Sequence, residues 1–377
     1  MSAPPELIIH QDPPCLVLRR DADALELSPL WLRERTRVPD QLEAMTQQRL
    51  FDSHAIDAAL ELESATPVGE HQVALAFSDG HRETFDLRFL LEEIDDAEDF
   101  PAPEPWDASL DRRELRFDWP RVQQDTDAFH ASLDAYLRRG YLILQGVPTD
   151  RERILEVGRH FGHVKETNFG RYFEVYSRPT GNDLAYRSVA LGPHTDNPYR
   201  SPVPGIQLLH CLVNETSGGL STLADSLKVL ERLRSEHPDG YQLLKTTPVR
   251  FRFVDAGTEL VTHRTMIRTD DAGDPTGVHY SPRLDTLPLL SDADTRAFHE
   301  ARQRLGELLT DPTCEARFAL QAGELLLFDN SRVLHGRTSY DPAEGQRHVQ
   351  GCYLDADGPR ERFASLRRHR GSIGQAA

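Results

Sequence analysis

The sequence predicts a mainly β protein with flanking helices, in which a small strand-rich unit precedes a larger antiparallel sandwich or jelly roll. From about residue 180 onward, short apolar runs such as 206–212 and 324–329 are separated by turns rich in Gly, Pro, Asn and Asp. A chain of 377 residues is long enough for one large and one smaller domain. We find no internal repeat and no low-complexity segment.

The first unit covers residues 1–98. Residues 16–18 and 71–77 are typical of strands, and residues 78–81 are typical of a hairpin turn. The next segment, 99–107, is acidic and rich in proline, which predicts a linker. The larger domain is therefore expected to cover residues 108–377.

The larger domain is expected to begin with helices around a buried strand. Residues 121–139 carry apolar side chains at helical spacing: Phe129, Leu133, Tyr136 and Leu137. Gly140 is expected to end this helix, and the apolar run 141–146 to form a buried strand. A second helix is predicted over 150–161.

Composition and charge exclude several classes of function. The formal net charge of −18 would repel a phosphate backbone, so we expect no nucleic-acid partner. The sequence contains no apolar run long enough for a bilayer and no signal-peptide pattern, so we expect no membrane association and a cytoplasmic protein. The four cysteines lack CxxC spacing and are expected to be reduced thiols: Cys15, Cys211, Cys314 and Cys352.

Two histidines and an aspartate form a candidate metal site. His194 and Asp196 are two residues apart, so in an extended segment both side chains point to one side. His335 follows a buried apolar run much later in the chain. Two imidazoles and one carboxylate on one face of an ion are typical of non-haem Fe(II) oxygenases. An isolated HxD is also compatible with a turn histidine that contacts a carboxylate.

Two further motifs strengthen the metal hypothesis. Arg347 follows His335 by twelve residues, and on the next strand its guanidinium could bind a carboxylate through two hydrogen bonds. Ser221 and Thr222 follow the glycine pair 218–219 and offer hydroxyls for the same group. Taken singly, the arginine fits a surface ion pair and the glycines fit a plain turn. Their order along the chain favours one functional site.

In this order, the motifs resemble the taurine dioxygenase superfamily, and more narrowly the γ-butyrobetaine hydroxylase family. The resemblance covers nearly the whole chain and lies in these segments: 194–196, 205–211, 334–337 and Arg347, with 30–33 and 48–52 in the first unit. It implies a double-stranded β-helix (jelly roll) domain after a small N-terminal domain, and a homodimer.

The resemblance also implies the cofactors. Fe(II) would be held by His194, Asp196 and His335, with 2-oxoglutarate and O₂ as co-substrates and ascorbate as an activator. Arg347 would hold the far carboxylate of 2-oxoglutarate, helped by one of the two hydroxyls. We assign no catalytic residue beyond the metal ligands, because hydrogen-atom transfer needs no general base.

One departure from the family concerns zinc. Family members often carry zinc-binding cysteines directly after the segment that corresponds to 30–33. Residues 34–39 of this chain contain no cysteine, so we expect no structural zinc.

The resemblance implies a trimethylammonium substrate. The family's aromatic cage corresponds to four positions that are all aromatic here: Phe169, Phe173, Tyr186 and Tyr353. Rings around a quaternary ammonium contribute roughly 0.5–2 kcal/mol each when water is excluded. The alternative for any one of these rings is ordinary core packing.

The anionic end of the substrate is expected to differ from a carboxylate. Asp183 and Tyr280 stand where the family has two asparagines, and an aspartate there would repel a carboxylate. Asn197, Tyr199 and Arg283 instead suit the three oxygens of a phosphonate. The chain thus resembles the 2-(trimethylamino)ethylphosphonate dioxygenase branch, whose implied reaction is hydroxylation at C1.

Three alternatives stay open. The first is hydroxylation of γ-butyrobetaine to carnitine. The second and weaker one is a trimethyllysine hydroxylase, for which we see no pair of opposite charges to bind an amino acid head group. The third is a metal-binding jelly roll without catalysis, against which Arg347 argues.

Overall fold

A computed structural model of the chain describes residues 5–95, 100–176, 188–255 and 257–374. The chain forms two compact units, Met1–Asp99 and Phe100–Ala377. Residues 100–107, which we expected to form a linker, are part of the second unit. Trp106 is buried there, its ring nitrogen donates to the Arg139 carbonyl at 2.7 Å, and its backbone N–H donates to Asp225.

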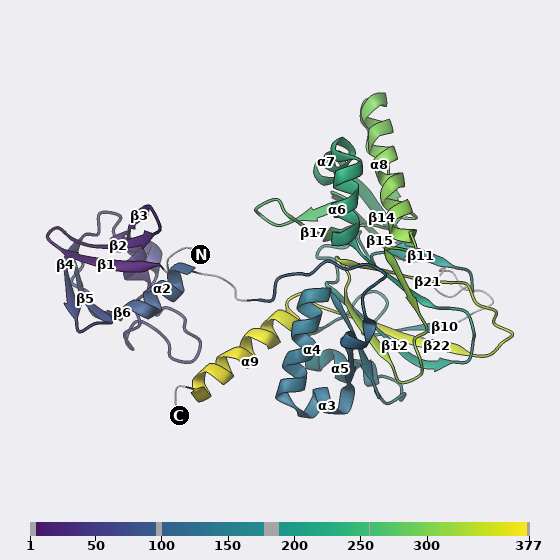
Figure 1. The fold of residues 1–377 in the computed structure, drawn as a ribbon, viewed down its shortest axis with the longest axis horizontal. Helices are drawn as coiled ribbons and strands as arrows, with labels where there is room; N and C mark the ends of the chain where they lie inside the picture. The colour runs from purple at the N-terminus through teal and green to yellow at the C-terminus, as the bar shows by residue number, and fades with distance from the viewer. Residues whose placement is uncertain (1–4, 96–99, 177–187, 256, 375–377) are drawn as a thin grey trace. The chain divides into compact units, whose positions relative to one another are not determined.

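The first unit contains two three-stranded antiparallel sheets, each built from consecutive strands (Figure 1). One sheet consists of β1 (Glu6–Gln11), β2 (Pro14–Arg20) and β3 (Asp23–Glu26). The other consists of β4 (Leu62–Val68), β5 (Gln72–Phe77) and β6 (Arg82–Asp86). The helical segments are α1 (Pro29–Glu34), η1 (Ser53–Ala55) and α2 (Leu87–Asp95). Leu16, Val73, Phe77 and Leu90 form part of a core that belongs to this unit alone.

The segment that lacks zinc-binding cysteines is held by hydrogen bonds and ion pairs. Thr36 donates to Glu83 at 2.6 Å, and His81 Nε2 lies 3.0 Å from the same carboxylate oxygen. Arg33 pairs with Asp79 at 2.8 Å. These contacts connect the chain after α1 to the β5–β6 hairpin.

The second unit is a mainly β jelly roll, as predicted, with two facing sheets. The larger sheet has the order β10-β22-β12-β20-β8-β7, with β9 paired to β22. Its strands are β7 (Arg116–Asp118), β8 (Tyr141–Gln145), β9 (Val164–Lys165), β10 (Phe173–Tyr176), β12 (Ile206–Asn214), β20 (Leu325–Asp329) and β22 (Arg347–Leu354). The smaller sheet has the order β11-β21-β13-β19, formed by β11 (Leu191–His194), β13 (Ser221–Asp225), β19 (Glu315–Phe318) and β21 (Val333–Arg337).

Alternate side chains of the strands fill the space between the two sheets. Leu326 and Phe328 of β20 pack with Leu223 of β13 and Val333 of β21 in one buried cluster. Residues on the opposite faces, such as Leu334 of β21, pack against helices instead. The alternation therefore fixes which side chains can reach the interior of the jelly roll.

Helices cover the outer faces of the sheets (Figure 1). The larger sheet packs against one group of helices: α3 (Trp119–Gln124), α4 (Thr126–Arg139), α5 (Arg153–Phe161) and α9 (Gly358–Gly374). The smaller sheet packs against a second group: α6 (Ser226–Glu236), α7 (Pro238–Thr246) and α8 (Asp292–Thr310). None of the helices within the described residues is both long and apolar enough to cross a bilayer.

The helix predicted over 121–139 is two helices, so that prediction was wrong in one respect. Asp125 has an extended backbone, and its side chain accepts hydrogen bonds from the N–H groups of Asp127 and Ala128. This cap begins α4 and separates it from α3. Gly140 ends α4 with φ of 77°, as predicted, and β8 is the buried strand expected next.

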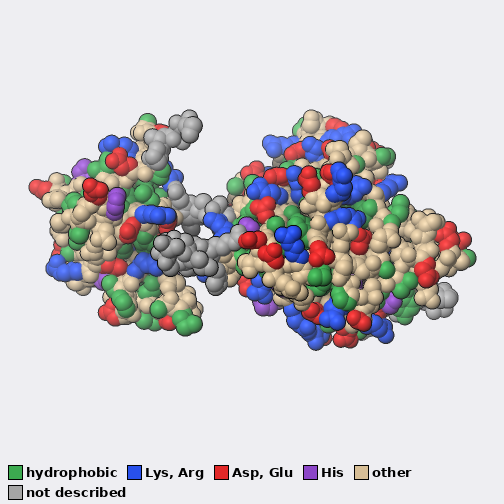
Figure 2. Space-filling model, turned by 60° about the horizontal axis from the view of Figure 1, so that its bottom comes forward, with side chains coloured by type: hydrophobic (Ala, Val, Ile, Leu, Met, Phe, Trp, Pro, Cys, Tyr) green, Lys and Arg blue, Asp and Glu red, His purple; other side chains and the backbone are tan. Residues whose placement is uncertain are grey.

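The remaining elements form smaller sheets beside the jelly roll. The first consists of β14 (Val249–Asp255), β15 (Thr258–Arg264) and β18 (Asp285–Thr286), and the second of β16 (Ile267–Thr269) and β17 (Pro275–Val278). A short helical turn, η2 (Arg112–Leu115), precedes β7. Acidic and basic side chains are interspersed over the visible face of each unit, without a large basic patch (Figure 2).

Candidate metal centre and substrate cavity

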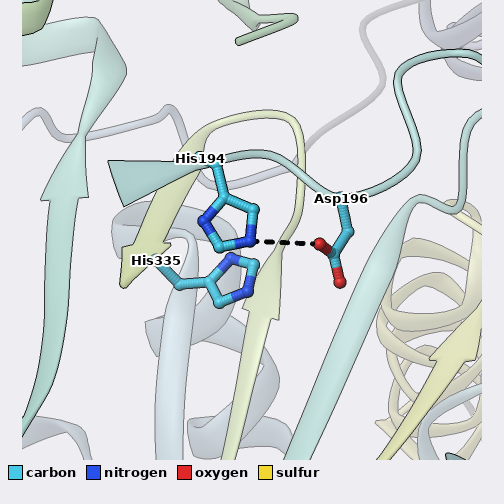
Figure 3. Close-up of side chains that lie close together, drawn as sticks. All are labelled: His194, Asp196 and His335. Carbon is cyan, nitrogen blue, oxygen red and sulfur yellow. Dashed lines mark ion pairs between the residues drawn. The ribbon is translucent and has the colours of Figure 1, made fainter. Parts of the chain in front are cut away.

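Two strands of the smaller sheet bring the three predicted metal ligands together (Figure 3). His194 at the end of β11 is the cross-strand partner of His335 on β21, and their ring centroids lie 4.3 Å apart. Asp196 follows β11, with its Oδ1 3.3 Å from His194 Nε2. One ligand atom from each residue lies within 4.8 Å of the other two. Two imidazoles and a carboxylate at this spacing can hold one divalent ion on one side.

The protonation states suit a metal. His194 Nδ1 lies 3.0 Å from the Gly192 carbonyl, and its Nε2 faces Asp196. Burial, together with a smaller effect of the nearby His194, lowers the pKa of His335 to about 3, so this imidazole is neutral. Burial alone would raise the pKa of Asp196, but the hydrogen bond from His194, the proximity of both histidines and the hydrogen bond from Tyr353 hold it below its ordinary value. Neutral imidazoles and an ionised carboxylate are the ligating forms.

Two residues that sequence reasoning did not assign to the metal hold Asp196 in place. The Tyr353 hydroxyl donates to Asp196 Oδ2 at 2.7 Å. Burial and the Asp196 charge raise the pKa of Tyr353 well above its ordinary value, so the hydroxyl stays a donor. The fully buried Asn330 accepts from the Asp196 N–H at 2.7 Å and donates to its carbonyl at 2.9 Å. Nothing in the local sequence around 330 distinguishes this role.

Arg347 lies at the start of β22 with its side chain toward the interior. Arg347 and Val349 are two residues apart on β22 and share a face, and Val349 belongs to the cluster between the sheets. Burial lowers the pKa of Arg347, and its buried Nε has no hydrogen-bond partner among the described residues. A buried donor without a partner is costly, so this position fits an arginine that binds an anion.

The two predicted hydroxyls lie on opposite faces of β13. Ser221 is the cross-strand partner of Arg337, which shares a face of β21 with His335. Thr222 is the partner of Gly336, on the face of the sheet that points away from the interior. The ladder therefore leaves Ser221 as the hydroxyl on the side of the metal site, and Thr222 is not brought there.

A cavity of about 380 Å³ opens beside the triad. Four aromatic residues were expected to bind a cation, and three of them lie within the described residues. All three line the cavity: Phe169, Phe173 and Tyr353. Tyr186, the fourth, lies outside the described residues. The other lining residues are Val175, Leu191, His194, Thr195, Asp196, Asn197, Tyr199, Phe253, Val254, Asp255, Ser281, Arg283 and Leu284.

The rings form a continuous wall. The Phe173 ring packs over Gly351 and lies 5.3 Å from the Tyr353 ring. Phe169 lies 6.4 Å from Phe173 and 5.9 Å from Phe253. Phe253, on β14, was missed by sequence reasoning, because alternation predicts a strand there without indicating which face meets the cavity.

The residues expected at the anionic end are only partly brought together. Asn197 and Tyr199 line the cavity, and the Tyr199 hydroxyl donates to Asn197 Oδ1. The buried Asn197 Nδ2 has no hydrogen-bond acceptor in good geometry among the described residues, and it lies near the Tyr353 hydroxyl. Arg283 also lines the cavity, with an exposed side chain.

Tyr280 does not belong to the cavity, so its expected role was wrong. Its side chain packs in the cluster under the helices, where a Cβ on Gly306 of α8 would lie 2.8 Å from the Tyr280 hydroxyl. The backbone of Tyr280 is hydrogen-bonded to Thr195, which lies between the metal ligands His194 and Asp196. Only the backbone of Tyr280 therefore lies near the metal site. Asp183 lies outside the described residues.

Comparison with known proteins agrees with this geometry. Residues 98–353 match the family described as taurine catabolism dioxygenase TauD, TfdA family. Residues 11–91 match the family described as gamma-butyrobetaine hydroxylase-like, N-terminal. A gamma-butyrobetaine dioxygenase from Pseudomonas sp. (strain AK-1) is 32% identical over 347 residues, 90% of each chain.

Two matches of lower identity extend the comparison. The mitochondrial trimethyllysine dioxygenase of Rattus norvegicus is 26% identical over 92% of this chain and 84% of its own. A solved asparagine oxygenase in complex with Fe(II), 2S,3S-3-hydroxyasparagine and succinate has the same fold, with a TM-score of 0.50 and 19% identity over 66% of this chain and 86% of its own. The chain therefore belongs to the TauD/TfdA family and is an iron- and 2-oxoglutarate-dependent dioxygenase.

Proposed function

We propose that the enzyme hydroxylates a small trimethylammonium compound with an anionic end, and that this compound is 2-(trimethylamino)ethylphosphonate, attacked at C1. The main support is the wall of rings beside the His–Asp–His triad, formed by Phe169, Phe173, Tyr353 and Phe253. Such a wall attracts a quaternary ammonium through cation–π contacts, at roughly 0.5–2 kcal/mol per ring when water is excluded.

In this proposal His194, Asp196 and His335 hold Fe(II), while Arg347 and Ser221 bind the far carboxylate of 2-oxoglutarate. When bound, the metal and co-substrate supply the oxidising chemistry: one oxygen atom of O₂ enters a substrate C–H bond, and 2-oxoglutarate leaves as succinate and CO₂. The protein contributes position. Tyr353 and Asn330 fix the Asp196 carboxylate and backbone, and the ring wall excludes water from the reacting carbon.

The anionic end is assigned to the part of the cavity lined by Asn197, Ser281 and Arg283. Asn197 Nδ2 is a buried donor with no well-placed acceptor among the described residues, Ser281 adds a hydroxyl, and Arg283 adds a positive charge. Three donors of this kind match the three oxygens of a phosphonate better than the two of a carboxylate. Ser281 takes the place of Tyr199 among these donors, because the Tyr199 hydroxyl donates to Asn197.

A second candidate is γ-butyrobetaine. It is favoured by the 32% identity to a gamma-butyrobetaine dioxygenase over most of both chains. The ring wall suits both substrates equally, so the anionic end decides between them. Homodimer formation stays an expectation from the family resemblance, and cytoplasmic residence stays a prediction from the sequence.

Succinate formation tests the proposal. Purified protein with Fe(II), ascorbate and 2-oxoglutarate is given 2-(trimethylamino)ethylphosphonate or γ-butyrobetaine at equal concentration. We expect a higher kcat/KM for the phosphonate. Preference for γ-butyrobetaine would contradict the phosphonate assignment and keep the trimethylammonium assignment, whereas turnover of neither would contradict both.

A variant sharpens the comparison. Asn197 has φ of 55°, a conformation that aspartate also tolerates, so Asn197→Asp keeps the backbone and replaces the buried donor with a negative charge. We expect kcat/KM for the phosphonate to fall much further than the turnover of 2-oxoglutarate without substrate. An equal fall in both would mean that Asn197 acts on the iron site rather than on the substrate.

A further inference from the structure

The Tyr340 ring, which follows β21, lies close to the guanidinium groups of two arginines. The guanidinium carbon of Arg337 lies 5.0 Å from the ring centroid, and that of Arg347 lies 5.7 Å from it. Tyr340 and Arg337 are buried, with 8% and 7% of their surfaces exposed. Two cations therefore share one aromatic ring in a place where water is largely excluded.

Both arginines reach the side of the sheets that carries the metal ligands. Arg337 follows His335 by two residues on β21, so the two side chains share a face, and Ser221 on β13 is opposite Arg337. Arg347 enters from β22 of the other sheet. The two guanidinium groups thus approach from opposite sheets, with the Ser221 position beside them.

The backbone around the ring is tightly constrained. Gly219 has φ of 65°, and a Cβ at this position would lie 2.9 Å from Arg347 Nε and 3.3 Å from the Tyr340 ring. A Cβ on Gly218 would lie 2.5 Å from the Ser339 carbonyl. Because Gly218 and Gly219 lack side chains, the backbone before β13 can pass directly against Arg347 and Tyr340.

Hydrogen bonds to backbone carbonyls hold Tyr340 and Arg337 in place. The Tyr340 N–H donates to the Ser188 carbonyl at 3.1 Å, and Arg337 Nη2 donates to the Val189 carbonyl at 3.0 Å. Like charges repel strongly at low dielectric, and the negative face of an aromatic ring offsets part of that repulsion. A carboxylate bound by both guanidinium groups would reduce the repulsion further.

We propose that Arg337 is a second cation for the distal carboxylate of 2-oxoglutarate, and that Tyr340 is the positioning residue that holds Arg337 and Arg347 as a pair. This inference rests on the proposed role of Arg347 in binding the same carboxylate. It extends the co-substrate site from one arginine to two arginines and a ring.

Calorimetric titration of the Mn(II)-loaded protein with 2-oxoglutarate and with pyruvate tests the role of Arg337. Pyruvate keeps the α-keto acid that chelates a metal and lacks the distal carboxylate. In Arg337→Gln we expect the dissociation constant for 2-oxoglutarate to rise about tenfold or more, as for loss of a hydrogen bond to a charged group. The dissociation constant for pyruvate should change less than about twofold, because pyruvate lacks the group that Arg337 would bind.

A matched pair of variants tests Tyr340. Tyr340→Phe keeps the ring and should bind 2-oxoglutarate as the wild type does, whereas Tyr340→Leu should raise its dissociation constant roughly threefold or more. The thermal midpoint without ligand is measured for each variant. If Arg337→Gln fails to fold, the Tyr340 pair decides the question.

The results distinguish failure of the proposed role of Arg347 from failure of the inference about Arg337 and Tyr340. If wild type binds 2-oxoglutarate no better than pyruvate, the proposed role of Arg347 fails together with this inference. If Arg347→Gln alone loses the preference, and Arg337→Gln and Tyr340→Leu keep it, only this inference is wrong. Equal weakening of both ligands in Arg337→Gln would also overturn it, because Arg337 would then act on the metal end.

Discussion

Tyr353 belongs to two parts of the site at once. Its ring lies in the cavity wall, 5.3 Å from Phe173, and its hydroxyl donates to the metal-facing carboxylate of Asp196 at 2.7 Å. The sequence indicated only the ring. Because a hydrogen bond to a ligating carboxylate orients it, the hydroxyl is expected to matter for the metal rather than for the substrate.

Tyr353→Phe separates the two roles. The ring stays, so the KM for the trimethylammonium substrate should change little. Loss of the hydroxyl should weaken Fe(II) binding by about tenfold, as is typical when a partner of a metal ligand is removed. Substrate titration at saturating Fe(II) measures the KM, and Fe(II) titration of turnover measures the Fe(II) affinity.

Tyr199→Phe is the matched control for this change. It removes a hydroxyl that donates to Asn197 instead of Asp196. We expect it to affect the KM for the anionic substrate and to leave Fe(II) binding unchanged. The reverse pattern in the two variants would contradict our assignment of both hydroxyls.

His335→Ala should abolish iron-dependent turnover, since two ligands remain of the three. The control is His263→Ala, which removes an exposed histidine on β15 of the same unit. Succinate formation at saturating Fe(II) is the measurement. Normal turnover in His335→Ala would refute the ligand assignment, and loss of turnover in both variants would indicate a general defect.

At the scale of elements, the turn before β13 links backbone conformation to co-substrate binding. Gly219 and Gly69 both have left-handed backbones, with φ of 65° and 64°. A Cβ at Gly69 meets nothing within 4 Å, whereas one at Gly219 meets Arg347 at 2.9 Å. Alanine would therefore meet similar backbone strain at both positions. Only at Gly219 would its methyl group also contact the Arg347 side chain.

Alanine substitution at both positions isolates the effect on Arg347. Each variant should lose about 1 kcal/mol or more of unfolding free energy from backbone strain. Only Gly219→Ala should also raise the KM for 2-oxoglutarate strongly. Denaturant unfolding and co-substrate titration measure the two effects, and an unchanged KM in Gly219→Ala would show that Arg347 accommodates the methyl group.

Several elements of the fold could be predicted from the sequence alone. The strands that carry His194 and His335, the end of α4 at Gly140 and the jelly roll itself follow from local patterns and motif order. The break before α4 depends on the side-chain cap from Asp125, which competes with a continuous helical pattern.

What could not be predicted depends on strand pairing and tertiary packing. The choice of Ser221 over Thr222 follows from the β13–β21 register, because a one-residue shift would exchange their faces. The placement of Tyr280 under α8, and of Phe253 in the cavity wall, depends on segments far apart in the sequence. Matching motifs one position at a time gives no information on these contacts.

At the scale of the whole molecule, each unit has its own hydrophobic core. The first unit buries residues such as Leu16, Phe77 and Leu90, all contributed from within the first hundred residues. The second unit has three buried clusters of its own and contains the triad, the cavity and Arg347. Separate cores predict separate unfolding equilibria, and a ligand stabilises only the unit that binds it.

Differential scanning calorimetry should therefore show two transitions with different ligand responses. Addition of Mn(II) and 2-oxoglutarate at about 100 times their dissociation constants should stabilise the second unit by about 2.7 kcal/mol for each site filled, from mass action alone. The transition of the first unit should not move. Gly69→Ala, which lies in the first unit, identifies that transition by lowering its midpoint without shifting the other. A single transition that moves as a whole with ligand would instead show that the two units unfold cooperatively, and the first unit would then contribute to the stability of the active site.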